Sequence, residues 1–145
     1  MRNFVFTSLL LALSAGASAA NAQAAGRLSV PVSGLRSDEG VVRCGLYAGA
    51  ATFPKAGQES RGVVAKIKGG QATCVFNGLK SGTYAVAAFH AANDETQMQY
   101  GMFGKPKEGY GFSRNPPARM GAPAFASAAF DFTGAAQSAP ITLSY

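Results

Sequence analysis

Apolar and polar residues alternate along most of the chain after residue 27, in short runs that end at turn residues. A period of two is typical of a half-buried strand, because successive side chains of a strand point to opposite faces. Gly69 and Gly70 between two such runs indicate a β-hairpin turn. The pattern predicts an antiparallel β-sandwich of about seven strands, near residues 28–32, 42–48, 63–67, 72–76, 83–89, 128–132 and 141–145.

A tyrosine close to the start of the fifth run narrows the fold class. The segment from Phe76 to Val86 contains a leucine, a tight turn at Gly82 and then Tyr84. It resembles the corner of transthyretin-like and related β-sandwich modules, in which the tyrosine hydroxyl bonds back to the preceding backbone. We therefore expect an all-β, immunoglobulin/transthyretin-like antiparallel β-sandwich, with at most one helical turn at residues 124–128.

Two cysteines are available to join the sheets of such a sandwich. Cys44 is in phase with Val42 and Leu46, and Cys74 is in phase with the apolar residues around it, so both thiols are expected on inward faces. The spacing lacks the close pair of a redox motif, and export to an oxidising compartment permits a bridge. An inter-sheet disulfide is favoured over two free buried thiols, and its loop of about 30 residues would be worth roughly 3–4 kcal/mol.

The first 24 residues have the three-part layout of a secretory signal peptide. A basic start is followed by an apolar run over residues 4–13 and then by small residues. The apolar run is about half as long as a membrane span. Cleavage is expected after Ala24 or, alternatively, after Ala19. The remaining residues, 25–145, are expected to form one β-sandwich domain, periplasmic or extracellular, without a transmembrane segment.

Composition limits the size of the fold and the kind of partner. The 145 residues are 48% hydrophobic and 14% charged, which suits one globular domain. Lys and Arg outnumber Asp and Glu by 13 to 7, so the net charge is +6. Such an excess favours anionic surfaces, but the basic residues are scattered and form no run suited to nucleic acid. We expect no nucleic-acid partner.

Residues 91–124 break the alternation and are too long for an ordinary connection. They are rich in aromatic residues, which disordered segments lack, so one long ordered loop is expected. Its rings either cover an open edge of the sandwich or, together with basic side chains, form a binding surface. The candidate binding residues are His90, Tyr100, Phe103, Lys105, Lys107, Tyr110, Phe112 and Arg114, with Arg119 as a further basic side chain.

The same loop carries a stretch with a family resemblance. Phe103–Ser113 together with Asn115, and shorter stretches such as Leu28–Leu35 and the pair Phe89 and His90, resemble the bacterial exported proteins of domain of unknown function family 2141. The resemblance extends over nearly the whole chain after residue 26. It implies an exported β-sandwich and no known activity.

Members of that family often follow the Phe-His pair with a loop of the calcium-binding type. In this chain the usual first and later aspartates fall on Ala91 and Gln99, which leaves Asn93, Asp94 and Glu95. Calcium takes about six to eight oxygen ligands, usually with several carboxylates. We therefore expect no metal, and no other cofactor.

The one histidine of the chain, His90, ends the fifth predicted strand in phase with Tyr84. We expect a structural, hydrogen-bonding role for it. The favoured hypothesis for the protein is an exported, non-enzymatic binding module of the cell envelope, whose partner is an envelope protein, a glycan or an anionic surface. The alternative is a small hydrolase or metal-dependent enzyme that uses His90 with Asp94, Glu95 or Glu108. A purely structural envelope component is a third hypothesis.

Overall fold

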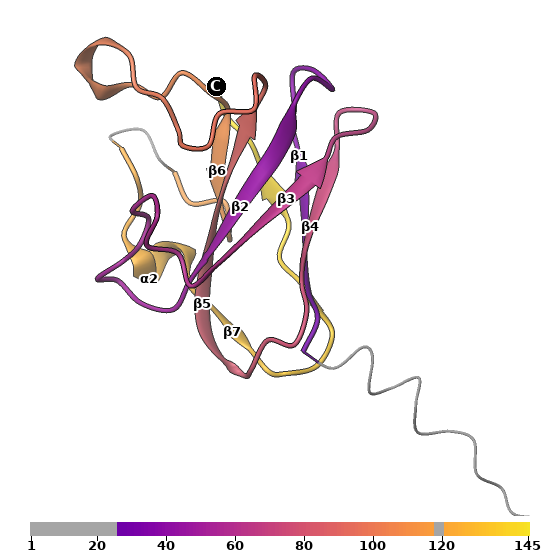
Figure 1. Cartoon of the computed structure of the whole chain (residues 1–145). Helices are drawn as coiled ribbons and strands as arrows, with labels where there is room; N and C mark the ends of the chain where they lie inside the picture. The colour runs from indigo at the N-terminus through magenta and orange to yellow at the C-terminus, as the bar shows by residue number, and fades with distance from the viewer. Residues whose placement is uncertain (1–25, 118–120) are drawn as a thin grey trace, which may run out of the picture.

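The computed structural model describes residues 26–117 and 121–145, and in these ranges the chain forms two β-sheets that face each other (Figure 1). The strands are β1 (Leu28–Ser33), β2 (Val41–Tyr47), β3 (Arg61–Lys66), β4 (Ala72–Phe76), β5 (Gly82–Ala91), β6 (Tyr110–Phe112), β7 (Phe130–Phe132), β8 (Gln137–Ser138) and β9 (Ile141–Thr142). Sheet A has the order β4-β1-β8, with β9 also paired to β1. Sheet B has the order β3-β2-β5-β6, with β7 paired to the start of β5. The all-β sandwich predicted from the alternation is confirmed.

Helical structure is limited to two short elements in the described ranges. The turn predicted near residues 124–128 is α2 (Phe125–Ala128), and η1 (Met102–Gly104) is a short 3-10 turn. No helix in the described part of the chain is long and apolar enough to cross a membrane. The predicted signal peptide, residues 1–24, and Arg119 lie outside the described residues.

Two strands, β6 and β8, were not predicted. β6 lies inside the predicted loop of residues 91–124, where it pairs with β5 and becomes the fourth strand of sheet B. Strands of two or three residues are too short to show alternation. The sandwich is antiparallel except at β1, which pairs in parallel with β8 and β9. Whether two strands pair in parallel depends on how the chain connects them, and the alternation of apolar and polar residues carries no information on that.

The inward faces of the two sheets form the main core. The apolar residues that alternate in β1, β2 and β4 are buried there, and Cys44 and Cys74 lie among them. These two cysteines form a disulfide between β2 of sheet B and β4 of sheet A, with their Cα atoms 6.5 Å apart. The predicted inter-sheet disulfide is confirmed, and both thiols point inward as their phase indicated.

Of two turn predictions, one is confirmed and the other holds only for the turn itself. The Tyr84 hydroxyl donates a hydrogen bond to the Lys80 carbonyl oxygen across 2.9 Å, as expected for the corner. Gly69 and Gly70 both have positive φ, 61° and 74°, and turn the chain from sheet B into sheet A. Lys68 and Gln71 form an isolated bridge across this turn, but β3 and β4 are not paired, so the predicted β-hairpin does not form beyond it. The Asp38 carboxylate accepts hydrogen bonds from both of their backbone N–H groups, at 2.8 and 2.7 Å.

A second apolar cluster lies outside the sandwich, on the outer face of sheet B. The Phe53 ring is at its centre, with ring centroids 5.3 Å from Tyr47, 5.8 Å from Phe112 and 5.7 Å from Phe125. Figure 1 shows the segments that cover this face, including α2, on the left of the sheets. Of the described residues of the long loop, Phe112 and Tyr110 thus pack against sheet B.

Candidate functional site

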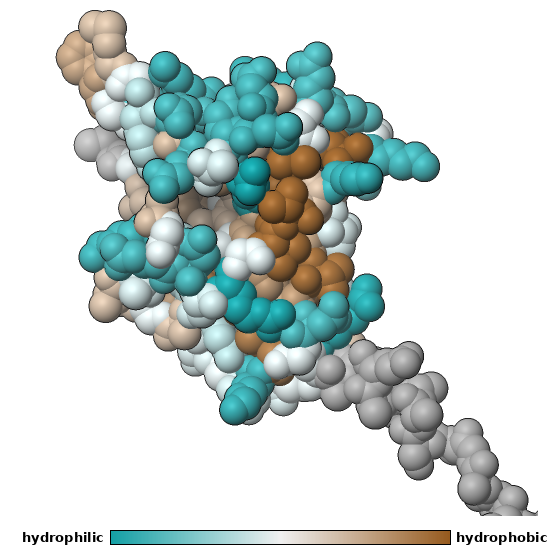
Figure 2. Space-filling view, viewed as in Figure 1, coloured by the Kyte–Doolittle hydropathy of each residue, from teal (hydrophilic) through white to brown (hydrophobic). Residues whose placement is uncertain are grey.

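The outer face of sheet B carries a pocket of about 680 Å³. Its floor is formed by β2, β3 and β5, and its sides come from residues 54–59, 96–106 and 110–112. Figure 2 shows this hollow between two groups of hydrophilic side chains, with pale and brown surface inside it. The size and the mixed lining are typical of a site for a small ligand.

The pocket exists because one row of sheet B has no bulky side chain on three neighbouring strands and ends at Phe112 on β6. Strand pairing places Gly62, Gly45 and Ala87 next to one another across β3, β2 and β5. The neighbouring row on the same face has the large residues Val64, Arg43, Phe89 and Tyr110. A row of small residues beside a row of large ones leaves a depression on the sheet.

Gly45 also lets two side chains approach the floor. A Cβ atom at this position would lie 3.2 Å from the Tyr47 ring and 3.3 Å from the Glu59 Cβ atom. Glu59 and Tyr47 therefore lie directly over the strand. At Gly62 the nearest atom to such a Cβ is a Glu59 carboxylate oxygen, at 3.8 Å.

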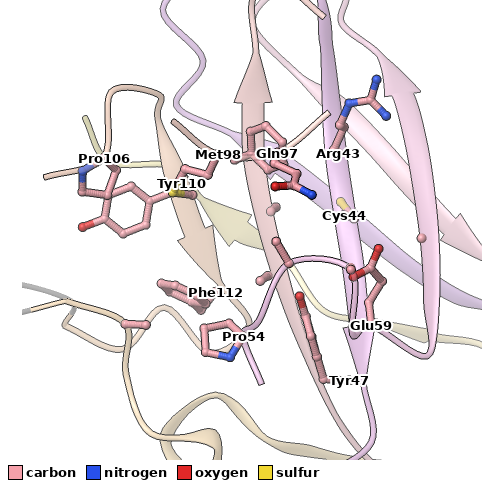
Figure 3. A pocket seen from close by; sticks show the side chains of 18 of the residues that line it. Arg43, Cys44, Tyr47, Pro54, Glu59, Gln97, Met98, Pro106, Tyr110 and Phe112 are labelled. Atoms are coloured by element: carbon pink, nitrogen blue, oxygen red, sulfur yellow. The ribbon is translucent and has the colours of Figure 1, made fainter. Parts of the chain in front are cut away.

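The polar and apolar groups of the pocket lie on different sides. Figure 3 shows the Tyr110 and Phe112 rings on one side, and Arg43, Tyr47 and Glu59 on the other. The Tyr47 hydroxyl donates a hydrogen bond to the Lys55 carbonyl oxygen across 3.2 Å. Burial, and then the nearby Glu59 and Tyr100, raise the pKa of Tyr47 to about 12. Tyr47 is therefore a neutral hydroxyl at physiological pH.

Two polar atoms of opposite kind in the pocket lack partners. The Nε atom of Arg43 and one carboxylate oxygen of Glu59, Oε2, are buried without a hydrogen bond to any described residue. A buried polar group without a partner costs about 1–3 kcal/mol, and more when it is charged. Arg43 and Glu59 both line the pocket, but these two atoms are closed off from solvent, so an occupant reaches them only when the two side chains turn.

The predicted binding residues fall into four different places. Tyr100, Tyr110 and Phe112 line the pocket. Phe103, Lys105 and Lys107 lie at the tip of the loop and outside the pocket lining. Arg114 donates a hydrogen bond to the Ala129 carbonyl oxygen across 3.2 Å. His90 is 3% exposed and lies apart from the pocket lining.

His90 is fully engaged by its neighbours. Its Nδ1 atom is 2.8 Å from the Tyr145 hydroxyl, and its Nε2 atom is 2.8 Å from the Glu39 carbonyl oxygen. Ser113, the only other buried polar residue in the described ranges, accepts a hydrogen bond from the Val86 N–H and donates one to the Ala128 carbonyl oxygen. The two side chains thus have separate partners, and neither is arranged as the nucleophile or base of a catalytic pair.

Two of the three acids of the alternative hypothesis, Glu95 and Glu108, have hydrogen-bond partners of their own. Glu108 accepts a hydrogen bond from the Gln99 backbone N–H at 2.9 Å. Glu95 accepts one from the Asn93 side chain at 3.0 Å, which lowers the pKa of Glu95. In the described part of the chain, no three His, Cys, Asp or Glu residues are close enough together to hold a metal ion.

The residues that shape the pocket were not among the predicted binding residues. Gly45 occupies an outward position of a predicted strand, and Gly62 lies one residue before the predicted strand of residues 63–67 but inside the observed β3. Arg43 lies in the same outward phase of β2. Glycine and a charged residue on the outer face of neighbouring strands were the available signal, but they point to a pocket only when the register between the strands is known.

These features define a class of protein, a disulfide-linked β-sandwich with an aromatic-lined pocket on the outer face of one sheet. The family model described as "Uncharacterized protein conserved in bacteria (DUF2141)" matches residues 30–139, and the chain belongs to this family. The matched range contains every residue that lines the pocket. No curated protein and no solved structure gave a significant match.

Proposed function

We propose that this protein is an exported, non-enzymatic binding module of the cell envelope that takes a small amide-bearing ligand into the pocket of sheet B. The observation that carries the proposal is the pair of unpartnered atoms, the Arg43 Nε donor and the Glu59 Oε2 acceptor. Because buried polar groups are almost always hydrogen-bonded, we infer that a ligand becomes the partner of both atoms when the Arg43 and Glu59 side chains turn toward it.

An amide group suits this pair, since it offers one carbonyl acceptor and one N–H donor. The Tyr110 and Phe112 rings provide an apolar wall for a flat group next to that amide. An N-acetylated sugar and a short peptide segment both have this chemistry. A polyanion fits poorly, because the Glu59 carboxylate would repel it.

Export supports the envelope as the location of this ligand. The signal-peptide pattern of residues 1–24 and the Cys44–Cys74 disulfide both suit an oxidising compartment. No observation favours catalysis at His90, since both of its ring nitrogens already have partners. A structural envelope component would need no pocket, so ligand binding separates the two hypotheses.

The test is a two-dimensional NMR titration with three probes. Tri-N-acetylchitotriose and N-acetyltyrosine methylamide carry amides, and cellotriose is a sugar without one. We expect shifts of the Gly45 and Ala87 backbone signals with at least one amide probe and none with cellotriose. Which amide probe binds more tightly distinguishes the glycan from the peptide.

A pocket-filling variant provides the control. Ala87→Phe places a ring over the floor and should abolish the shifts, whereas Thr73→Phe on the exposed face of β4 should leave them unchanged. Shifts that persist in Ala87→Phe would show binding elsewhere on the surface. Absence of any response to both amide probes contradicts the proposal.

A further inference from the structure

The tip of the long loop exposes two large apolar side chains to solvent. Phe103 is 100% exposed and Met102 is 82% exposed, and both belong to η1. In Figure 1 this element stands at the upper left, at the end of the loop that projects beyond the sheets. Adjacent exposed apolar side chains at a projecting point indicate an interaction site.

The tip is built as an ordered turn. Gly101 and Lys105 are joined by a backbone hydrogen bond of 2.8 Å, and Tyr100 forms an isolated bridge with Pro106. Within this turn Phe103 has a φ of 62°. This left-handed conformation is unfavourable for a residue with a Cβ atom, so the fold holds Phe103 outward at a conformational cost.

Positive charge lies directly beside the exposed pair. Lys105 and Lys107 follow it, and among the described residues neither amino group takes part in an ion pair or hydrogen bond. The nearest acid in the sequence, Glu108, is hydrogen-bonded to the Gln99 backbone. The net charge of the chain, +6, acts in the same direction. The tip thus combines two exposed apolar side chains with two lysine side chains that lack an ion-pair partner among the described residues.

We propose that this tip, defined as Met102, Phe103, Lys105 and Lys107, docks onto an anionic phospholipid surface. Met102 and Phe103 enter the boundary between headgroups and acyl chains, and the two lysines contact the phosphates. Apolar and aromatic side chains flanked by basic ones are the usual combination at such interfaces. None of these four residues lines the pocket, so the proposal is independent of the ligand proposed above.

The first experiment is cosedimentation of the exported protein with large vesicles. We expect binding to vesicles of phosphatidylcholine with about 30% phosphatidylglycerol and much weaker binding to pure phosphatidylcholine. Phe103→Ala should weaken the binding by about tenfold. The pair Lys105→Ala and Lys107→Ala should weaken it by roughly fivefold for each lysine, whereas Lys66→Ala with Lys80→Ala, which removes the same charge, should have a much smaller effect.

The second experiment places a reporter at the tip. The sequence has no tryptophan, so Phe103→Trp introduces a single one. Its emission should shift to shorter wavelength on the anionic vesicles, while Thr73→Trp on β4 should show no shift. Thermal unfolding of each variant checks that the fold is kept, as expected for such exposed positions.

The outcomes separate cleanly. Failure of the wild type to bind the anionic vesicles overturns the proposal and leaves a protein partner as the explanation for the exposed tip. If both lysine pairs weaken vesicle binding equally, the contact lies elsewhere on the surface and the proposal is wrong. The same conclusion follows if Phe103→Trp binds the vesicles without a shift of its tryptophan emission.

Discussion

The Tyr145 hydroxyl oxygen lies 2.8 Å from the Nδ1 atom of His90. The other ring nitrogen, Nε2, lies 2.8 Å from the Glu39 carbonyl oxygen, which can only accept, so Nε2 carries a proton. The Tyr145 hydroxyl also accepts a hydrogen bond from the Arg36 backbone N–H at 3.2 Å. The guanidinium of Arg36 lies 4.1 Å above the centre of the Tyr145 ring and holds it from the other side. This cluster joins the end of β5 to the segment before β2.

Removal of the Tyr145 hydroxyl should therefore weaken the fold without affecting the pocket. Tyr145→Phe leaves the buried Nδ1 atom of His90 without its hydrogen-bond partner, and we expect a loss of about 1 kcal/mol in the free energy of unfolding. Urea denaturation measures it. Tyr100→Phe removes the same atom from a 61% exposed side chain and should cost much less. Equal effects of the two substitutions would contradict the structural role of His90.

Ser113 is expected to be a structural residue of the family stretch. Ser113→Ala leaves the Val86 N–H and the Ala128 carbonyl without their side-chain partner, in a fully buried place. The expected loss is about 1–3 kcal/mol in the free energy of unfolding, measured by urea denaturation. The control is Ser138→Ala at an exposed serine of β8. Unchanged stability with a loss of ligand binding would instead indicate a functional serine.

The two floor glycines should respond differently to alanine. Both have extended backbone, where alanine is favoured over glycine by roughly 0.5–1 kcal/mol. At Gly62 the new Cβ finds its nearest neighbour at 3.8 Å, so Gly62→Ala should stabilise the protein. At Gly45 the new Cβ would lie 3.2 Å from the Tyr47 ring and 3.3 Å from the Glu59 Cβ atom. Gly45→Ala should therefore leave the stability of the protein unchanged or lower it. Thermal unfolding of both variants decides, and a gain at Gly45 equal to that at Gly62 would show that Tyr47 and Glu59 can move away.

The raised pKa of Tyr47 predicts a loss of stability in alkaline solution. The unfolded chain releases this proton near pH 10, whereas the folded chain holds it to about pH 12. Between these values the folded state binds more protons than the unfolded state, so the free energy of unfolding falls as pH rises. Tyr47→Phe should reduce that fall relative to the wild type.

Tyrosinate absorbance provides a direct measurement of the same group. The folded wild type, with its 5 tyrosines, should show a late step near pH 12 that is absent from Tyr47→Phe and from urea-unfolded protein. Loss of the late step in urea confirms that burial causes it. A folded wild type without a late step would mean that solvent reaches Tyr47.

Several features of the fold were predictable because they depend on local phase. Alternation placed Cys44 and Cys74 on inward faces, and the structure joins them across the two sheets. The tight turn before Tyr84 predicted its corner hydrogen bond, and two adjacent glycines predicted the turn between β3 and β4. In each case a few neighbouring residues fix the backbone conformation or the direction of a side chain.

The candidate site was only partly predictable. Aromatic content identified Tyr110 and Phe112 as candidates, and both line the pocket. The same content also selected Phe103, which lies fully exposed at the tip, because composition does not say which ring packs on a sheet. Strand β6 was hidden for a related reason, since its three residues gain their strand conformation from pairing with β5.

The sequence by itself determined the class of fold, the disulfide and the family, because these follow from local alternation and from a continuous stretch of residues. Only the tertiary structure decided that Gly62, Gly45 and Ala87 share one row and that Arg43 and Glu59 present unpaired atoms beside it. The register between strands brings these residues together from distant parts of the chain. The pocket depends on this register between strands, so it cannot be recognised from the sequence of any single strand.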